Sequence, residues 1–577
     1  MVDSLTSSLR FEKDEVSSSK GLVTASTPQS AEAGLKLLRD GGNAVDSGVA
    51  MGFCNTVLEP YLASLAGLGF MLIFSADEDR VIAIDFNTRA PRGATPDMFE
   101  VVGEASAGGT KVFEVKDNEN SVGAKAVTIP ATLAGLCMAH KLYGLLPLSK
   151  VMEPAINLAS DGFSLGWDQA LILALMMRDG KRSPEVETSW YPGGYPPFPN
   201  ARIVQPDLGR LLRRISSDGP GFVYKGDVTD AVVKTVKDGG GLLTSEDLAS
   251  YMPVVSKPLS VNYRGFEVAT VPTPSGGVTI LETLNILEGF DLASYGHNSA
   301  EYLHILVEAS RHAFADRYSF LGDWEVAEVP LEGILSKSYA VDVARLIEDK
   351  GTAFKSDEVA EPWIKYLSNP LHDPWNHQGH KGRRAKSTYA SGIGETTHFN
   401  SVDSYGNAVC CTHTPGFQSG LTPQGTGLYL TSAMGWFVPK PGYPNSIVGW
   451  KRPLMNMAPL MVLKDGRPLL LQGAPGSRRI ISRNLQVVLN VIEFRMGPHE
   501  AVAAPTVDAS GLETLIDSRI PAEVAKALEG KGHKVSVVEE GPGMSAFARP
   551  SAVQIDREKG YLRGGVDLFR RSTALGL

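Results

Sequence analysis

The chain has 577 residues, 43% of them hydrophobic, enough to bury a large core in several domains or in one large layered domain. Its 55 basic and 64 acidic residues give a net charge of -9 without a basic block. We therefore expect neither nucleic acid nor a membrane as a partner, and a small molecule is the expected ligand. Only four cysteines occur, which argues against a disulfide framework.

The N-terminal region, residues 1–20, lacks the apolar segment of about 7–15 residues that a secretory signal requires. We expect a flexible N-terminus and a cytoplasmic protein. The most apolar region, residues 44–74, is interrupted by Asp46, Asn55 and Glu59, which a membrane span would have to bury without water. It predicts a buried helix followed by a strand.

Three later patterns predict helices. "SAEAGLKLLRDGG" begins with Ser30 as the expected N-cap and ends at glycines. "TSEDLASY" from Thr244 has a capping-box pattern, and "SAEYLHILVEASRHAFADR" from Ser299 carries an apolar stripe. We predict that the region of residues 125–345 is mainly helical.

Four strand-turn-strand patterns stand apart from the helical region. Each alternates apolar residues around a turn rich in Asp, Gly, Asn or Lys, and they span residues 70–86, 398–414, 460–472 and 552–564. Because the first lies far from the others in sequence, both ends of the chain are expected to complete the same antiparallel sheets. The prediction is a layered α+β fold forming one composite domain.

Residues 352–395 are polar and rich in Pro, His, Gly and basic residues, which predicts an exposed, mobile segment. His372, His377 and His380 lie in it at irregular spacing. We interpret them as solvated loop residues and predict no metal site and no cofactor.

The stretch "ETTHFNSVDSYGNAVCCTHT" follows this segment directly. If its turn is Asp403 to Asn407, Val402 pairs with Ala408, and counting back places Thr396 opposite Thr414. A threonine freed as a chain end has an α-amine with a pKa of about 7.7–8.0, suited to activate its own hydroxyl as a nucleophile. His398 is interpreted as a packing or hydrogen-bonding residue rather than the base.

These residues resemble the γ-glutamyltransferases (glutathione hydrolases), a family of N-terminal-nucleophile hydrolases. "TTHFNSVDSYGNAV" resembles the start of their small subunit. Four further segments occur in the family's order: "GGNAVDSGVAMGF", "YRGFEVATVPTPSGG", "KRPLMNMAP" and "GAPGSRRII".

The resemblance implies a four-layer αββα sandwich made as one chain that cuts itself before Thr396. It divides the protein into a large subunit, residues 21–395 after the N-terminus, and a small subunit, residues 396–577. It implies that Thr396 is the nucleophile and that Thr414 orients it. Gly476 and Ser477 match the glycine pair whose backbone N–H groups form the oxyanion hole, with serine in place of the second glycine.

The substrate-binding positions depart from the family. The arginine that binds the glutamyl α-carboxylate is replaced by Asn87, although Arg89 two residues later shares its face in a strand. The glutamine and aspartate that bind the α-amino group fall on Ala433 and Trp436. The family's serine pair is replaced by Met455 and Asn456, and its asparagine after the second threonine falls near Gly416.

Three functional hypotheses follow. In the first, a self-processing amidohydrolase or acyltransferase cleaves a γ-glutamyl compound such as glutathione, or a related small amide, and passes the acyl group to water or an amine. In the second, the same machinery acts on a different short acyl amide, whose carboxylate or keto group Arg89 or Asn456 would hold. In the third, the chain is an unprocessed, inactive interaction protein.

Overall fold

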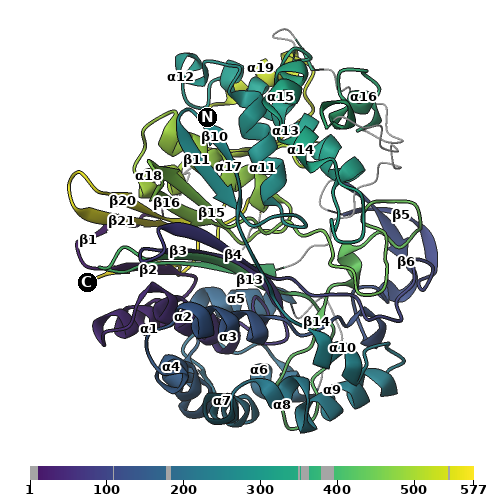
Figure 1. Cartoon of the computed structure of the whole chain (residues 1–577), viewed down its shortest axis with the longest axis vertical. Helices are drawn as coiled ribbons and strands as arrows, with labels where there is room; N and C mark the ends of the chain where they lie inside the picture. Colours follow the sequence, from purple (N-terminus) through teal and green to yellow (C-terminus); the bar gives the residue numbers. More distant parts are fainter. Residues whose placement is uncertain are drawn as a thin grey trace, which may run out of the picture.

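The computed structural model describes residues 11–107, 110–176, 184–347, 351–352, 363–378, 395–511, 513–542 and 546–577. Two antiparallel sheets lie face to face between two helical layers (Figure 1). This arrangement confirms the predicted αββα sandwich, and strands from both ends of the chain enter each sheet, as expected.

The first sheet contains the predicted hairpins at 70–86 and 398–414 at its centre. Its strands, in spatial order, are β22 (Thr573–Gly576), β2 (Leu22–Ala25), β12 (Glu395–Val402), β13 (Ala408–Gln418), β3 (Leu68–Ser75), β4 (Arg80–Phe86) and β9 (Val254–Ser256), with β14 (Thr431–Ser432) paired to the end of β13. Since β12 and β13 lie in the middle of the sheet, both are buried on their two faces, and their polar side chains, such as His398 and Asn400, are buried with them.

The second sheet contains the predicted hairpins at 460–472 and 552–564. Its strands, in spatial order, are β1 (Val16–Ser18), β21 (Tyr561–Val566), β20 (Ser551–Asp556), β16 (Arg467–Gly473), β15 (Leu460–Lys464), β11 (Phe266–Thr270) and β10 (Leu259–Tyr263). The hairpin β10–β11 lies inside residues 125–345, the region predicted to be mainly helical, as do β9 and the two-residue strands at 163–164 and 202–203.

Three small sheets lie outside the sandwich. They are β17 (Val507–Asp508), β18 (Thr514–Asp517) and β19 (Val535–Val538); β5 (Val101–Ala107) and β6 (Thr110–Val115); and β7 (Phe163–Ser164) and β8 (Arg202–Ile203).

One helical layer covers the first sheet. Its helices are α1 (Pro28–Arg39), α2 (Ala44–Leu58), α3 (Thr132–Tyr143), α4 (Leu148–Asp161), α5 (Trp167–Met176), α6 (Pro184–Trp190), α7 (Pro206–Asp218), α8 (Gly221–Tyr224), α9 (Asp227–Asp238) and α10 (Ser245–Ser250). Every residue of α2 is buried, because this helix packs between β12 and β13 on one side and α1, α3 and α4 on the other.

The other layer covers the second sheet. Its helices are α11 (Gly277–Leu287), α12 (Leu292–Tyr295), α13 (Ala300–Phe320), α14 (Leu331–Ile334), α15 (Lys337–Ala344), α16 (Ile364–Leu367), α17 (Arg479–Ile492), α18 (Pro498–Ala503) and α19 (Ala522–Gly530). Within the described ranges, no helix is both long enough and apolar enough to span a bilayer.

The predicted cap is confirmed at Thr244, whose side chain accepts from a backbone N–H of α10, and the predicted helix after Ser299 is α13, with Ser299 as its N-cap. The prediction for Ser30 is wrong. The N-cap of α1 is Thr27, whose hydroxyl accepts from the Ser30 N–H at 3.3 Å, because Pro28 provides a favourable first helical residue.

Two regions expected to be exposed are packed. Residues 11–20 include β1, and Lys13 Nζ donates to three carbonyl oxygens near the C-terminus, those of Asp567, Arg570 and Ser572. Flexibility of the whole segment 1–20 is therefore a wrong prediction, and residues 1–10 lie outside the described residues.

In the pre-strand segment 352–395, residues 363–378 form α16 and a short 3-10 turn that bury Trp363 and Trp375. His372 is fully buried, 3.5 Å from Asp316, so its interpretation as a solvated residue is wrong. His377 is partly exposed and lies 3.3 Å from Asp342. The aromatic side chains near these histidines bury apolar surface, and this burial holds residues 363–378 against the rest of the protein. His380 and the rest of the segment, apart from residues 352 and 395, lie outside the described residues.

Candidate active site

The turn of the β12–β13 hairpin is built as predicted. Val402 pairs with Ala408, and the buried Asp403 carboxylate accepts from the N–H groups of Tyr405 and Asn407, each at 2.9 Å. Its other oxygen accepts from the Ala44 N–H at 2.8 Å, at the start of α2. The turn is thereby fixed both internally and to the helical layer, and this sets the register of the hairpin.

The other end of the hairpin contains an irregularity. Thr397 pairs with His413, but Glu395 pairs with Gly416, so β13 has one extra residue opposite Thr396. Thr396 therefore lies beside Thr414 and Pro415, close to the position obtained by counting back from the turn. The Thr414 hydroxyl accepts from the Gly416 N–H at 3.0 Å, and both threonines are buried. A β-bulge at this point re-aims the strand end.

Alternation along β12 shows which way Thr396 faces. The neighbouring Thr397 hydroxyl donates to Ser26 at 2.9 Å, and Phe399 packs towards α2. His398 and Asn400 face the second sheet instead: His398 lies against Gly473, and Asn400 donates to Ser551. Thr396 shares the face of His398, so it points towards the segment that follows Gly473.

His398 is held as a neutral structural residue. Its Nδ1 lies 2.8 Å from the Thr412 hydroxyl and its Nε2 lies 3.1 Å from Asn400 Oδ1. Burial lowers the pKa of His398 to about 3. It therefore stays uncharged at neutral pH, which agrees with its interpretation as a hydrogen-bonding residue.

The segment after Gly473 is a tight turn into helix α17. Gly476 has φ 142°, and a Cβ there would lie 2.5 Å from the Ala548 Cα, so only glycine fits. Ser477 has φ 57°, the left-handed region that glycine adopts more easily. The N-cap residue Arg478 makes no side-chain capping bond to the helix. This turn therefore presents backbone N–H groups at a helix N-terminus, which can stabilise negative charge.

Asn87 lies at the same edge of the first sheet as the two threonines. Thr414 pairs with Leu68 and Gly69 pairs with Phe86, so continuing this register places Asn87 opposite Leu68. Two strand spacings, about 10 Å, separate it from Thr414. The Asn87 amide donates to the Pro453 carbonyl at 2.9 Å, while its buried Oδ1 has no hydrogen-bond partner among the residues that the structure describes.

Arg89 is bound inside the protein rather than presented to a ligand. Its guanidinium donates to Glu325 at 2.8 Å and to the Trp450 carbonyl at 2.9 Å, and it lies over the Trp450 ring. Only 8% of the residue is exposed. The charge of Arg89 is therefore compensated before any substrate binds.

Sequence reasoning missed Arg317, on the last turn of α13. Its guanidinium donates to the Met455 carbonyl and to Asn456 Oδ1, both at 2.8 Å, and burial lowers its pKa to about 10. Among the described residues no carboxylate forms an ion pair with it. The Asn456 Nδ2 atom beside it is buried without a partner. The sequence signal that could have identified Arg317 is the presence of an arginine on an otherwise apolar helix face.

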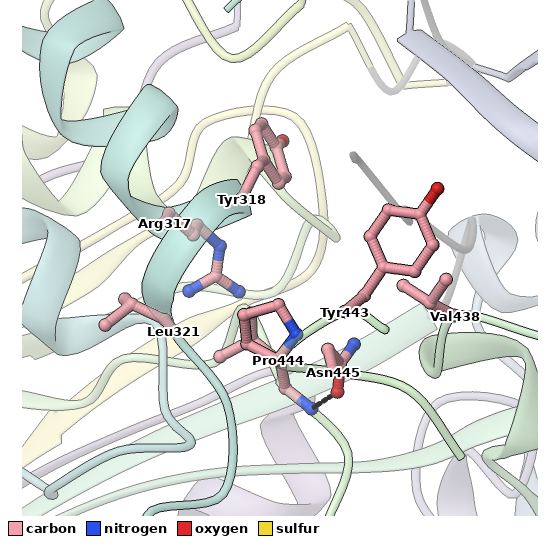
Figure 2. Close-up of a pocket in the computed structure, with 8 residues that line it drawn as sticks. Arg317, Tyr318, Leu321, Val438, Tyr443, Pro444 and Asn445 are labelled. Atoms are coloured by element: carbon pink, nitrogen blue, oxygen red, sulfur yellow. Dashed lines mark hydrogen bonds between the residues drawn. The ribbon is translucent and has the colours of Figure 1, made fainter. Parts of the chain in front are cut away.

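Figure 2 shows the surroundings of Arg317. Its guanidinium points towards the loop that carries Tyr443, Pro444 and Asn445, and Tyr318 lies on the same helix. The small cavity between them has a volume of about 10 Å³. That is room for about one water molecule.

The positions of the family's α-amino ligands are apolar here. Ala433 is fully buried, and Trp436 stacks on Phe417 with 5.3 Å between ring centroids. Phe417 follows Gly416 near the end of β13. The arrangement provides an aromatic surface where an ammonium group would require a carboxylate.

Comparison with known proteins agrees with this geometry. The family model of gamma-glutamyltranspeptidase matches residues 30–577. The Acylase ACY 1 proenzyme of Pseudomonas sp. (strain SE83) is 37% identical over 527 residues, covering 91% of this chain and 88% of that protein. The glutathione hydrolase proenzyme of Escherichia coli (strain K12) is 35% identical over 549 residues, covering 91% and 87%. The crystal structure of cephalosporin acylase from Bacillus halodurans has a TM-score of 0.85 at 25% identity, covering 100% of this chain and 99% of that one.

Two antiparallel sheets between helical layers, with a threonine at the start of a central strand facing the other sheet, define an N-terminal-nucleophile hydrolase. The chain belongs to the gamma-glutamyltranspeptidase family, whose model covers nearly all of it. The protein is thus an enzyme of the amide-hydrolysing and acyl-transferring class, as the first two hypotheses expected, and the hypothesis of an inactive interaction protein is set aside.

Proposed function

We propose that the chain cuts itself between Glu395 and Thr396. The Thr396 hydroxyl attacks the Glu395 carbonyl, the C–N bond breaks, and an ester joins the Glu395 carbonyl to the threonine oxygen while the α-amine is released. Water then hydrolyses the ester to a Glu395 carboxylate and the free hydroxyl. The products are residues 1–395 and 396–577.

In the mature enzyme the α-amine of Thr396 accepts the proton of its own hydroxyl as that oxygen attacks a substrate amide. The leaving amine takes the proton, and water or an acceptor amine resolves the acyl-enzyme ester. Thr414, beside Thr396 across the β-bulge, orients the nucleophile. The N–H groups of Gly476 and Ser477 stabilise the oxyanion. The β-bulge that sets Thr396 beside Thr414 is the observation that supports this assignment.

The intact mass of purified protein tests the cut. In wild-type protein we expect two fragments, one ending at Glu395 and the other beginning at Thr396. In Thr396→Ala we expect one full-length species. Thr397→Ala is the matched control, because that hydroxyl points away from the second sheet, to Ser26. A single species in aged wild-type protein, or normal cutting of Thr396→Ala, contradicts the assignment.

We propose that the substrate is a small acyl amide whose acyl group carries no free α-ammonium. Ala433 and Trp436 supply no carboxylate for such a group, and Arg89 is already paired with Glu325. The 37% identity to an acylase supports this proposal. A γ-glutamyl amide is the second candidate, favoured by the 35% identity to a glutathione hydrolase.

Release of 4-nitroaniline from a γ-glutamyl anilide and from matched acyl anilides separates these candidates. We expect the processed enzyme to turn over an acyl anilide faster than the γ-glutamyl compound. Losing one charged hydrogen-bond partner costs about 1.5–3 kcal/mol, or roughly 10- to 100-fold in kcat/KM. A kcat/KM for the γ-glutamyl anilide above that for every other anilide would favour the second candidate instead.

A further inference from the structure

A large cavity lies at the end of β13, between that strand and helices α5 and α6 of the lower layer in Figure 1. Its volume is about 290 Å³, close to the size of a drug-like binding site. Aliphatic and aromatic side chains dominate its lining, among them Leu173, Met176, Trp190, Phe417 and Leu421. None of its lining residues within the described ranges is charged.

The cavity adjoins the proposed nucleophile. Gly416 lines it, pairs with Glu395 in the sheet, and donates its N–H to the Thr414 hydroxyl at 3.0 Å. Phe417 also lines it and stacks on Trp436. Removing Glu395 from β12 by the proposed cut would leave its place beside Gly416 open, and this joins the cavity to Thr396.

In the scissile amide bond, Glu395 supplies the carbonyl, so the position that it leaves is the one for an acyl group. In self-cleavage, the Thr396 oxygen attacks the Glu395 carbonyl and carries the preceding chain as an ester. The same oxygen attacks the substrate carbonyl, so the group attached to that carbonyl takes the side that Glu395 occupied. The amine of the substrate departs from the other side.

We propose that this cavity is the acyl-chain subsite and that it takes an apolar acyl group, aromatic or medium-length alkyl. The inference rests on the proposed function and narrows its substrate class. An ammonium group would lose its hydration here without gaining an ionic partner, since the described lining residues include no carboxylate. Transfer of an apolar acyl group from water to this apolar lining is instead favourable. The indole N–H of Trp190 donates to the Tyr429 hydroxyl oxygen at 3.0 Å, so this N–H needs no acceptor from a ligand.

A series of acyl 4-nitroanilides tests the subsite: acetyl, hexanoyl, phenylacetyl and γ-glutamyl. Full burial of a group the size of a leucine or phenylalanine side chain corresponds to an increase of roughly 10- to 100-fold in kcat/KM. We expect kcat/KM to rise by that factor from acetyl to phenylacetyl. Met176→Trp fills the cavity from the end of α5 and is expected to lower kcat/KM for the phenylacetyl anilide to the value for the acetyl anilide. Leu175→Trp is the matched control, because that neighbour is 43% exposed and does not line the cavity.

Three outcomes overturn the inference. They are equal kcat/KM for acetyl and phenylacetyl anilides, an unchanged preference in Met176→Trp, and a preference that follows the amine when the acyl group is held constant. In all three the enzyme still cuts itself and hydrolyses an anilide, so the proposed function stands. Failure of the proposed function has a different signature, which is a wild-type chain that remains uncut.

Discussion

Replacing Gly476 by alanine is the most direct perturbation of the turn that faces Thr396. The position has φ 142°, which side chains other than glycine rarely adopt. The added Cβ would also lie 2.5 Å from both the Cα and the Cβ of Ala548. Ala548 belongs to backbone that is tied to the turn by the Arg549 N–H, which donates to the Pro475 carbonyl at 2.9 Å. The overlap therefore cannot be relieved by rotating a side chain.

The magnitude follows from two contributions. Holding alanine in this backbone region costs about 1–3 kcal/mol, and overpacking against a fixed backbone costs a similar amount. We expect the turn to move rather than retain roughly 2–6 kcal/mol of strain. Moving the N–H groups of Gly476 and Ser477 removes donors from the oxyanion, and loss of one such donor lowers kcat by about 10²–10³.

The assay measures the rate of self-cutting by intact mass and kcat of the processed protein, with thermal unfolding to verify that the variant is folded. Gly466→Ala is the control. It also has positive φ, 74°, but no atom lies within 4 Å of the added Cβ, and it is in the β15–β16 turn. Its kcat is expected to equal that of wild type. A folded Gly476→Ala protein with kcat and cutting rate within threefold of wild type would refute the reasoning.

Three further predictions follow from the site. Ser477→Gly relieves the left-handed strain at φ 57° and is expected to raise the unfolding free energy by about 1 kcal/mol with little change in kcat; a lower denaturation midpoint contradicts this. Arg452→Met leaves the carboxylates of Asp85 and Asp323 buried without their partner at 2.7 and 2.6 Å, which lowers the unfolding free energy of the uncut Thr396→Ala background by about 3–5 kcal/mol in a denaturant titration. Arg80→Met, at the exposed pair with Glu78, is the control and is expected to leave the denaturation midpoint unchanged. The kcat/KM of the processed enzyme is expected to rise with pH through a single inflection near about 7.7–8.0, because the protonated α-amine cannot accept the hydroxyl proton. His398, with its pKa lowered to about 3, adds no inflection at neutral pH, and a second step near 6.5 that vanishes in His398→Asn would contradict its structural role.

The hairpins were predictable because their signals are local. Period-two alternation and an Asp-to-Asn turn are contained within "HFNSVDSYGNAVCCTHT", and the structure pairs Val402 with Ala408 as counted. The β-bulge beside Thr396 was not predictable from alternation, since the extra residue on β13 arises where Gly416 also pairs with Ser432 of β14. A third strand, β14, pairs at this position, and the alternation pattern of the hairpin does not include it.

The substrate-binding region was the least predictable part. Sequence reasoning could note that Asn87 and Arg89 share a face, but not that Glu325 and the Trp450 carbonyl already bind the arginine. Those partners come from elements 236 and 361 residues away along the chain. The buried Arg317 was missed for the same reason, because its acceptors lie on the segment that contains Met455 and Asn456. Charge compensation across such separations depends on tertiary structure.

The strand order of the first sheet has a consequence for maturation. A cut before Thr396 would place β22, β12 and β13 on the small fragment and β2, β3 and β4 on the large one, so that β2 lies between two strands of the other fragment. In the second sheet, four strands of the small fragment, β21, β20, β16 and β15, lie between β1 at one edge and β11 and β10 at the other, all three from the large fragment. Before the cut, folding is a reaction within one chain. Afterwards, unfolded fragments must find each other in solution, and regaining the structure becomes dependent on concentration. The proposed cut would therefore be a one-way step. It would free the α-amine of Thr396, and the enzyme could no longer refold as a single chain.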